Sequence, residues 1–235
     1  MVTLFNKENN LNDHTLIIPS VSVGNAPQLC VDLIIATFGL KKIANIWHPA
    51  IISTVGSDPY ADNCTELCTA CELYSNDESK ISVIQLRSSL EHKLASTFFK
   101  DLKSSLESFN LKRIVLLGSG FDYELRTVSN HKFYYTSNEN IQKLMEDNRI
   151  KQLQENLNGK IVIHGDGFTG ILYKILNDKF KTTALVKYVS EGDNIPDAVS
   201  MLETICAIYK INHPQLKIPS SWKYLFGGPP PIGIF

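Results

Sequence analysis

Two groups of residues combine the types and the spacing that chemistry requires. Cys64, Cys68 and Cys71 form the pattern C-x3-C-x2-C, with which radical enzymes hold a four-iron cluster through three thiolates. The hexapeptide at 165–170 has the spacing G-x-G-x-x-G, and dinucleotide-binding proteins place a pyrophosphate on such a loop. Glu191 follows about twenty residues later, where an acid would bind the ribose. The first pattern is typical of an iron–sulfur protein and the second of a nucleotide-dependent enzyme.

The predicted local structure favours structural cysteines over a metal cluster. Cys68 and Cys71 fall in residues 65–74, which alternate like a strand, and an odd separation in a strand directs two side chains to opposite faces. Three thiolates converge on one cluster only from a loop. The chain of 235 residues is also far shorter than the barrel that radical enzymes need. We therefore expect half-buried thiols and no metal site, with the cluster as the open alternative.

The glycine-rich hexapeptide also has two interpretations. It stands between a predicted strand at 160–164 and a predicted helix at 169–176, as a phosphate-binding loop would. However, that helix has only about two turns, and Asp166 would face the phosphates with a like charge. The remainder of the chain after Glu191 is too short for the rest of a dinucleotide domain. We therefore favour a tight strand-to-helix connection, built with glycines at positive φ, and keep nucleotide binding as the alternative.

The remaining polar residues form no catalytic pattern. The six histidines are scattered without a pair at i, i+4. Gly118-Ser119-Gly120 lacks the glycine two residues before the serine that a nucleophile elbow has. We therefore predict no catalytic residue, no cofactor and no metal, and the nucleotide-dependent enzyme that uses residues 165–170 stays as the alternative.

The hydrophobic pattern predicts the elements that position these residues. Strands are expected at 16–18, 42–47, 65–74, 80–87, 113–117, 160–164 and 183–189. Helices are expected from Asn25 as cap to Gly39, and at 91–109, 140–157, 169–176 and 194–209, the last with Asn194 as cap. Strands that alternate with helices predict an α/β layered domain. The hairpin between 65 and 87 predicts a sheet that is mixed rather than parallel.

The bulk properties narrow the class of protein. The formal net charge is −1 without a basic stripe, which argues against nucleic acid or an anionic membrane as the main partner. The longest apolar runs are too short to span a bilayer. The N-terminal residues lack the apolar region of a secretory signal, and five cysteines in such a chain are typical of reduced thiols. We therefore expect a cytoplasmic and nuclear protein.

Four segments together resemble one family, the proteasome assembly chaperone 2 family. They are Pro19–Asn25 with Gln28-Leu29 and Asp32–Ile35, Gln85–Ser88, Tyr188–Ala198, and Ile218–Trp222 with Leu225-Phe226-Gly227 and the apolar end. The resemblance thus extends from one end of the chain to the other. It is densest in Tyr188–Ala198, which reads Y-V-S-E-G-D-N-I-P-D-A.

The resemblance implies a chaperone without enzymatic activity or cofactor. It implies a three-layer α/β/α fold with a mixed central sheet, similar in shape to nucleoside phosphorylases but without their active site. Members of the family pair with proteasome assembly chaperone 1, and the heterodimer docks on the outer face of the 20S proteasome α-ring. There it promotes ring assembly and deters misassembled α-subunits and premature cap binding. In this family, residues 165–170 and 191–197 would be elements of the fold.

The resemblance also gives the C-terminal residues a role. We expect a single chaperone domain over residues 1–226 and an extended tail over 227–235, because glycines and prolines keep this segment out of the fold. Family tails dock between α-subunits through a hydrophobic residue, a tyrosine and a final carboxylate. Here Gly233, Ile234 and Phe235 stand at those positions, so the tyrosine is missing. The alternative is a tail that packs on its own domain.

Overall fold

The computed structural model describes residues 2–4, 11–61, 66–125, 132–153, 163–212 and 214–224. In these residues nine strands form one sheet, in the order β1-β3-β6-β7-β2-β8-β11-β9-β10, and β4 and β5 form a second, two-stranded sheet. The strands are β1 Val2–Leu4, β2 Thr15–Pro19, β3 Lys41–Ile46, β4 Val55–Ser57, β5 Leu67–Thr69, β6 Cys71–Asn76, β7 Ile81–Leu86, β8 Arg113–Phe121, β9 Phe133–Ser137, β10 Lys151–Gln152 and β11 Thr182–Val189.

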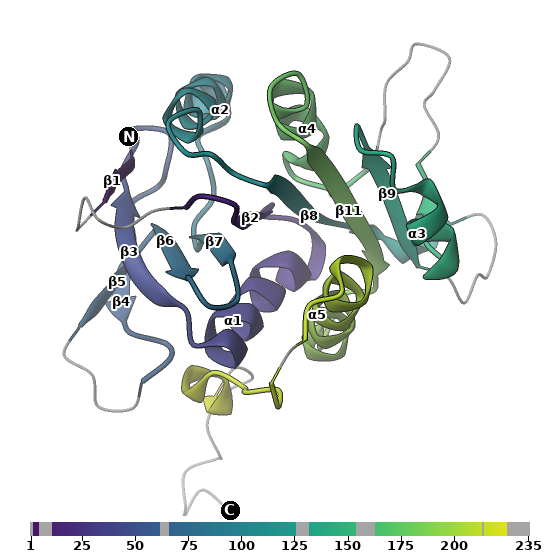
Figure 1. Ribbon diagram of the computed structural model, residues 1–235. Coiled ribbons are helices and arrows are strands. Elements are labelled where there is room, and N and C mark those ends of the chain that lie inside the picture. The colour runs from purple at the N-terminus through teal and green to yellow at the C-terminus, as the bar shows by residue number, and fades with distance from the viewer. Residues whose placement is uncertain are drawn as a thin grey trace, which may run out of the picture.

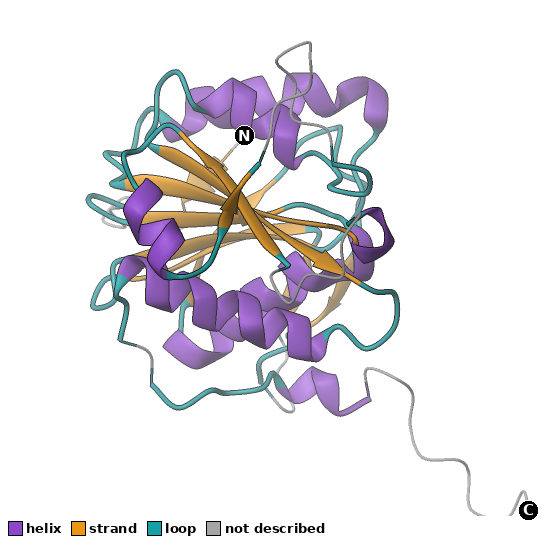
Figure 2. Cartoon of the chain, turned by 90° about the vertical axis from the view of Figure 1, so that its right-hand side faces the viewer, coloured by secondary structure: helices purple, strands orange, loops and turns teal. Residues whose placement is uncertain are grey.

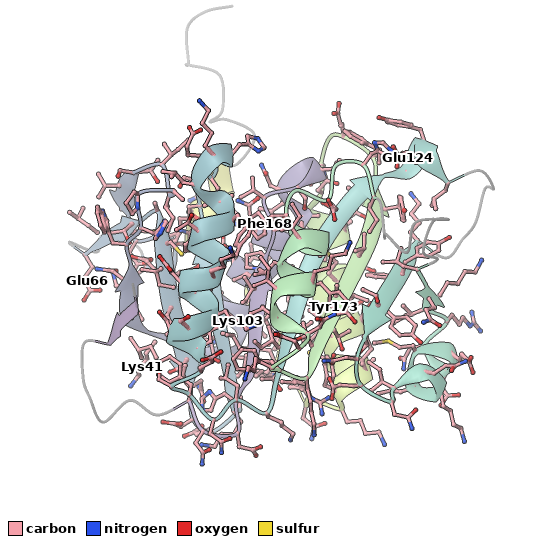
Figure 3. The ribbon with its side chains drawn as sticks, turned by 90° about the horizontal axis from the view of Figure 1, so that it is seen from above. Lys41, Glu66, Lys103, Glu124, Phe168 and Tyr173 are labelled. Atoms are coloured by element: carbon pink, nitrogen blue, oxygen red, sulfur yellow. The ribbon has the colours of Figure 1, made fainter. Side chains whose placement is uncertain are left out.

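Helices cover both faces of the large sheet (Figures 1 and 2). They are α1 Ala26–Phe38, α2 His92–Leu106, α3 Gln142–Asp147, α4 Thr169–Leu176 and α5 Ile195–Tyr209. The helices α1 and α5 share one hydrophobic cluster with the sheet, and α2 and α4 share another on the opposite face. Seen from above, α2 and α4 lie side by side with Phe168 between them (Figure 3). The predicted three-layer α/β/α fold is confirmed. None of the described helices combines the length and the apolar character needed to cross a membrane.

The sheet is mixed, as predicted. At its centre β2 pairs in parallel with both β7 and β8, and β8 pairs in parallel with β11. The hairpin of β6 and β7 is antiparallel, and so are the pairs β3–β6 and β9–β11. The strands β3, β7, β2, β8 and β11 therefore all end at the same edge of the sheet. We call this the carboxyl edge, and it begins after Ile46, Leu86, Pro19, Phe121 and Val189.

The central strands are buried on both faces, which explains their unbroken apolar sequence. All eight residues of β11 are buried, and so are Ile114 to Gly120 of β8. Alternate side chains of β8 enter opposite clusters: Val115 and Leu117 face α1 and α5, and Ile114 and Leu116 face α2 and α4. The strand continues past Leu117, where the prediction ended, because Gly118 and Gly120 admit the side chains of Thr169 and Tyr188.

Two predicted helix caps differ in detail from the structure. Gly39 ends α1 in the left-handed conformation at φ 59°, as predicted. Asn25, however, makes no side-chain capping bond and is itself left-handed at φ 51°. Asn194 makes none either; the N–H of Ile195 donates instead to Asp193 Oδ1 at 3.0 Å. Asn25 and Asn194 therefore occupy the predicted N-cap positions, and both helices begin where they were expected, but neither side chain makes a capping bond.

The predicted helix over 140–157 is wrong beyond Asp147. The chain turns at Arg149, which has φ 59°, and the N–H of Ile150 donates to the carbonyl of Met145 at 2.9 Å. Ile150 is 3% exposed, so its burial favours the turn over a longer helix. The next residues, 151 and 152, form β10, and residues 154–157 lie outside the described ranges. Of the predicted strand at 160–164, only Ile163 and His164 are described, and both lie in a loop.

Candidate functional site

The predicted site residues Gly233, Ile234 and Phe235 lie outside the described part of the chain, as does the boundary at residue 226. The structure does describe the segment from which they continue. This is the 3-10 helix η3, Ser220–Tyr224, which lies below α1 next to the end of the described chain (Figure 1). We call η3 and the residues that it contacts the tail root.

The tail root is attached to the domain through backbone and core contacts. Trp222 is 7% exposed and packs in the hydrophobic cluster of α1 and α5. The N–H of Ser221 donates to the carbonyl of Pro59 at 3.2 Å, and the Ser220 hydroxyl donates to the same oxygen at 3.4 Å. Before η3, the N–H of Lys217 donates to Thr37 Oγ1 on α1 at 3.2 Å. Residues beyond 224 therefore continue from a fixed point on the surface.

A charged network lies next to this point, beside Pro59. The Tyr60 hydroxyl donates to Asp32 Oδ1 at 2.5 Å and accepts a bond from Arg87 at 2.7 Å. Arg87 also donates to Asp32 Oδ1 at 2.8 Å and to Oδ2 at 3.3 Å. Burial, followed by the charge of Asp32, raises the pKa of Tyr60, so its hydroxyl keeps its proton. Burial lowers the pKa of Arg87, but the interactions with Asp32 and Tyr60 and the charge of Cys68 together outweigh burial, so the pKa of Arg87 is raised.

Two glutamines extend the network between α1 and β7. Gln85 Nε2 donates to Asp32 Oδ1 at 2.6 Å and to the carbonyl of Gln28 at 2.9 Å. Gln28 Nε2 donates in return to the carbonyl of Leu86 at 2.8 Å. Three of the segments that carry the family resemblance therefore meet here, at the tail root. Sequence reasoning assigned them no role, although an aspartate on an otherwise apolar helix is the kind of signal that indicates a buried partner.

The glycine-rich loop is filled by the protein itself. Gly167 has φ 65°, and a Cβ atom there would lie 2.1 Å from the carbonyl oxygen of Val21 and 2.5 Å from Ser20 Oγ. The N–H of Phe168 donates to Ser20 Oγ at 2.8 Å, and Asp166 Oδ2 accepts the N–H of Gly170 at 3.1 Å. The N–H groups of Phe168 and Gly170, which a bound phosphate would need as donors, are thus already bonded to side chains of the protein. The geometry favours the interpretation of residues 165–170 as a tight connection.

The segment around Glu191 likewise serves the fold. Glu191 is exposed at the end of β11. Three residues later, Asn194 is 2% exposed and packs on Gly24, where a Cβ atom would lie 2.4 Å from Asn194 Nδ2. Gly24 has φ 66°, so it is required both by its backbone and by this close approach. The remaining segment of the family resemblance, 188–198, thus packs against residues 19–25 of the first segment at the carboxyl edge.

The cysteines Cys68 and Cys71 lie in different sheets, β5 and β6, and are 5% and 1% exposed. They are more buried than predicted. Burial raises the pKa of Cys68 to about 11 and also raises that of Cys71, which favours the thiol over the metal-binding thiolate. In the part of the chain that the structure describes, no three potential metal ligands gather. Cys64, the first member of the motif, lies outside it.

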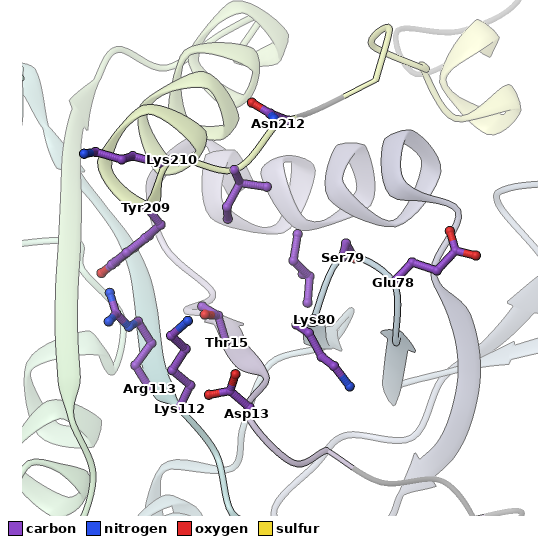
Figure 4. Close-up of a pocket in the computed structure, with 12 residues that line it drawn as sticks. Asp13, Thr15, Glu78, Ser79, Lys80, Lys112, Arg113, Tyr209, Lys210 and Asn212 are labelled. Carbon is purple, nitrogen blue, oxygen red and sulfur yellow. The ribbon is translucent and has the colours of Figure 1, made fainter.

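A polar cavity of about 400 Å³ lies at the opposite edge, where β2 and β8 begin (Figure 4). Its charged lining residues have both signs: Asp13, Glu78, Lys80, Lys112, Arg113 and Lys210. Arg113 is paired with Glu139 at 3.4 Å and lies 4.8 Å above the ring of Tyr209. None of the segments that carry the family resemblance lines this cavity, so we place the candidate site at the tail root.

Comparisons with known proteins confirm the family resemblance. The model of the PAC2 family matches residues 16–221. Proteasome assembly chaperone 2 of Mus musculus is 34% identical and that of Homo sapiens 33% identical, in each case over 96% of both chains. Among solved structures, Pyrococcus furiosus PbaA, an archaeal homolog of proteasome-assembly chaperone, superposes with a TM-score of 0.69 at 13% identity, covering 96% of this chain and 92% of that one. Pyrococcus furiosus PbaB, an archaeal proteasome activator, gives 0.64 at 12% identity over 90% and 89%. At these identities the two structures establish the fold alone.

Proposed function

Because this chain belongs to the PAC2 family, we propose that it acts as a non-enzymatic chaperone in assembly of the 20S proteasome. The observation that carries the proposal is the similarity to proteins named proteasome assembly chaperone 2, which covers almost the whole of both chains. The filled glycine loop supports it, because that loop was the basis of the alternative, a nucleotide-dependent enzyme.

We further propose that the chain pairs with proteasome assembly chaperone 1 and that the pair docks on the outer face of the α-ring. The proposed division of labour is a chaperone domain over residues 1–226 and a docking tail over 227–235. The tail root supports this division, since η3 is fixed to the domain by Trp222 and Pro59 while eleven residues follow it. Eleven residues could reach at most about 36–40 Å when fully extended.

In this proposal Gly233, Ile234 and Phe235 contact the α-ring. Burial of Ile234 and Phe235 would contribute about 1.5–3 kcal/mol each. The ordering of the tail and the loss of translational freedom offset much of this gain. One tail therefore binds weakly, and two tails of a heterodimer reach useful affinity through effective concentration.

Co-purification tests the proposed function. The chain is expressed with an N-terminal affinity tag, so that the C-terminal tail stays unmodified, and its bound proteins are identified by mass spectrometry. We expect proteasome assembly chaperone 1 and proteasomal α-subunits, and both should be enriched over a tagged protein of unrelated fold. Recovery of the chain alone, from cells that contain both partners, would contradict the proposal.

A further inference from the structure

Exposed apolar side chains gather at one place on the surface. Within the described ranges, eight large hydrophobic residues are exposed, and four of them fall between positions 47 and 67. They are Trp47 at 70%, Ile52 at 51%, Val55 at 69% and Leu67 at 61%. We call these four residues the apolar face. The other four are Leu94, Tyr123, Ile171 and Ile218.

The apolar face is also depleted of charge. The segment 47–57 contains no Asp, Glu, Lys or Arg. Its one histidine, His48, is 8% exposed and bonds Asp101 on α2 at 3.3 Å. The residues from 52 to 57 are all exposed. The centres of protein interfaces have this composition, with few charges and an excess of aromatic side chains.

A rigid base holds the apolar face in position. Val55 and Leu67 belong to the small antiparallel sheet of β4 and β5. Glu72 on β6 fixes this sheet, because its Oε1 accepts the N–H of Thr69 at 2.9 Å. Lys42 on β3 adds a bond from Nζ to the carbonyl of Leu67 at 2.8 Å. Beside Trp47, a largely apolar cavity of about 340 Å³ is lined by Ile46, Ile51 and Ala70 among others. This cavity can accept an apolar side chain of a partner.

The apolar face lies next to the tail root without covering it. Trp47 follows β3 at the carboxyl edge, and the segment after β4 leads directly to Pro59, which carries η3. The apolar face is at the β1–β3 end of the large sheet. In Figure 3, Glu66, the neighbour of Leu67 in the sequence, marks this end of the molecule, and Glu124 lies towards the other end. We expect a subunit bound at this end of the sheet to leave η3 accessible.

The size of the apolar face suits part of a stable interface. Since an aromatic side chain covers about 150–250 Å², Trp47 at 70% exposure offers on the order of 150 Å². With Ile52, Val55 and Leu67, the face offers on the order of 400 Å², about half of the roughly 800 Å² that each partner contributes to a typical interface. An apolar patch of this size on a single subunit indicates a binding surface.

We propose that the apolar face binds the partner subunit of the heterodimer. The occupant is a second α/β subunit that presents an uncharged, apolar surface with one large side chain for the cavity beside Trp47. This inference rests on the proposed function, because it assumes that the chain works as one half of a pair. It adds the location of the interface, at the end of the sheet beyond β3, and separates that interface from the tail.

Pairing of surface variants tests the inference. The chain is co-expressed with tagged proteasome assembly chaperone 1, and affinity is measured with purified subunits. The double variant Trp47→Ser/Val55→Ser should pair at least tenfold more weakly, since aromatic residues at interface centres dominate binding. Ile52→Ser should weaken pairing, whereas Ile171→Ser, a matched control at 56% exposure on α4, should leave it unchanged. The melting temperature of each variant is recorded separately.

Hydrogen–deuterium exchange of the unmodified pair gives a second measurement that does not depend on the folding of a variant. We expect residues 51–57 to be protected in the pair relative to the free chain, with α2 unchanged. Undiminished pairing of the double variant, or unprotected 51–57, overturns the inference while the proposed function stands. If the double variant loses α-ring binding but still pairs, the apolar face binds the ring, and the inference is overturned. If the double variant changes only self-association, the face binds a second copy of this chain, and the inference is overturned as well. Failure of the unmodified chain to pair contradicts the proposed function itself.

Discussion

At the scale of single residues, Asp32 is the acceptor that holds the hydrogen-bond network beside the tail root together. It is 6% exposed on α1, and its carboxylate accepts bonds from Tyr60, Gln85 and Arg87, which come from a loop and from β7 and its end. Because a buried carboxylate is stable only when its lone pairs are satisfied, these donors must remain in place. Asp32 thereby fixes the loop whose Pro59 carbonyl receives η3.

The substitution Asp32→Asn tests this role. Loss of one member of a buried ion pair costs about 3–5 kcal/mol. Because the Arg87 side chain is 23% exposed, water screens part of the interaction, and we expect a smaller cost, about 2–3 kcal/mol. The surface pair Lys103–Asp178, at 2.7 Å, is the control, since Asp178 is 59% exposed and Asp178→Asn should leave the free energy of unfolding almost unchanged. Urea unfolding measures both; equal costs would contradict the assigned role.

At the scale of elements, Glu72 determines how the small sheet of β4 and β5 attaches to the large one. Its carboxylate accepts bonds from the Tyr74 hydroxyl at 2.5 Å, from the Thr69 N–H at 2.9 Å and from Lys42 at 3.3 Å. Burial opposes the ionisation of Glu72, but these donors outweigh burial and hold its pKa below the usual 4.5. The charged form is therefore the one that stabilises the attachment.

The pH dependence of Glu72→Gln follows from this shift. Since the pKa of Glu72 is lower in the folded protein than in the unfolded one, its stabilisation is present above about pH 4.5 and is lost as the pH falls through the folded value. We expect the variant to be less stable than the wild type at pH 7 and the difference to shrink below pH 4.5. Glu107→Gln, at the exposed end of α2, is the charge-matched control. A difference that grows on acidification would refute the argument.

The close packing of the glycine-rich loop, residues 165–170, predicts that a substitution in it lowers stability. Gly167→Ala forces a Cβ atom against the Val21 carbonyl at positive φ, and such strain costs on the order of 1–3 kcal/mol. Gly56→Ala is the control, because nothing lies within 4 Å of a Cβ atom there. Thermal unfolding should show a clear loss for the first and little change for the second. A melting temperature of the wild type that rises with NAD would contradict the filled loop.

The elements differ in how far the sequence predicted them. The helix α4 and the strand β11 were predicted almost to the residue, because their apolar periodicity coincides with burial of the same residues. The helix over 140–157 was not, because helix-forming polar residues are a weak guide where a single residue, Ile150, is drawn into the core. The strand β9 was missed altogether.

The candidate site was less predictable than the fold. Asp32, Tyr60 and Arg87 are 27 to 55 positions apart in the sequence, and only the pairing of α1 with β7 brings them together. Periodicity describes neighbours along the chain and carries no information on such contacts. The family resemblance marked two of these residues, Asp32 and Arg87, but gave them no role. The tail residues themselves stay a prediction.

At the scale of the whole molecule, the carboxyl edge gathers the features that the proposed function needs. The tail root, the apolar face and the packed segments around Gly24 and Asn194 all lie along it or directly after its strands. Among the described residues, the opposite edge carries the polar cavity with charges of both signs. A chaperone that presents one edge of its sheet to an assembling ring would use this arrangement.

The most direct test is the affinity of the purified heterodimer for the 20S proteasome α-ring after removal of Ile234 and Phe235. We expect the affinity to fall by a factor on the order of ten or more with an unchanged melting temperature, because the tail root ends before these residues. Ile234→Ser should reproduce part of the loss, whereas Ile218→Ser, at a 60% exposed isoleucine before η3, should not. Full affinity of the truncated heterodimer would contradict the claim that the tail docks the chaperone on the ring.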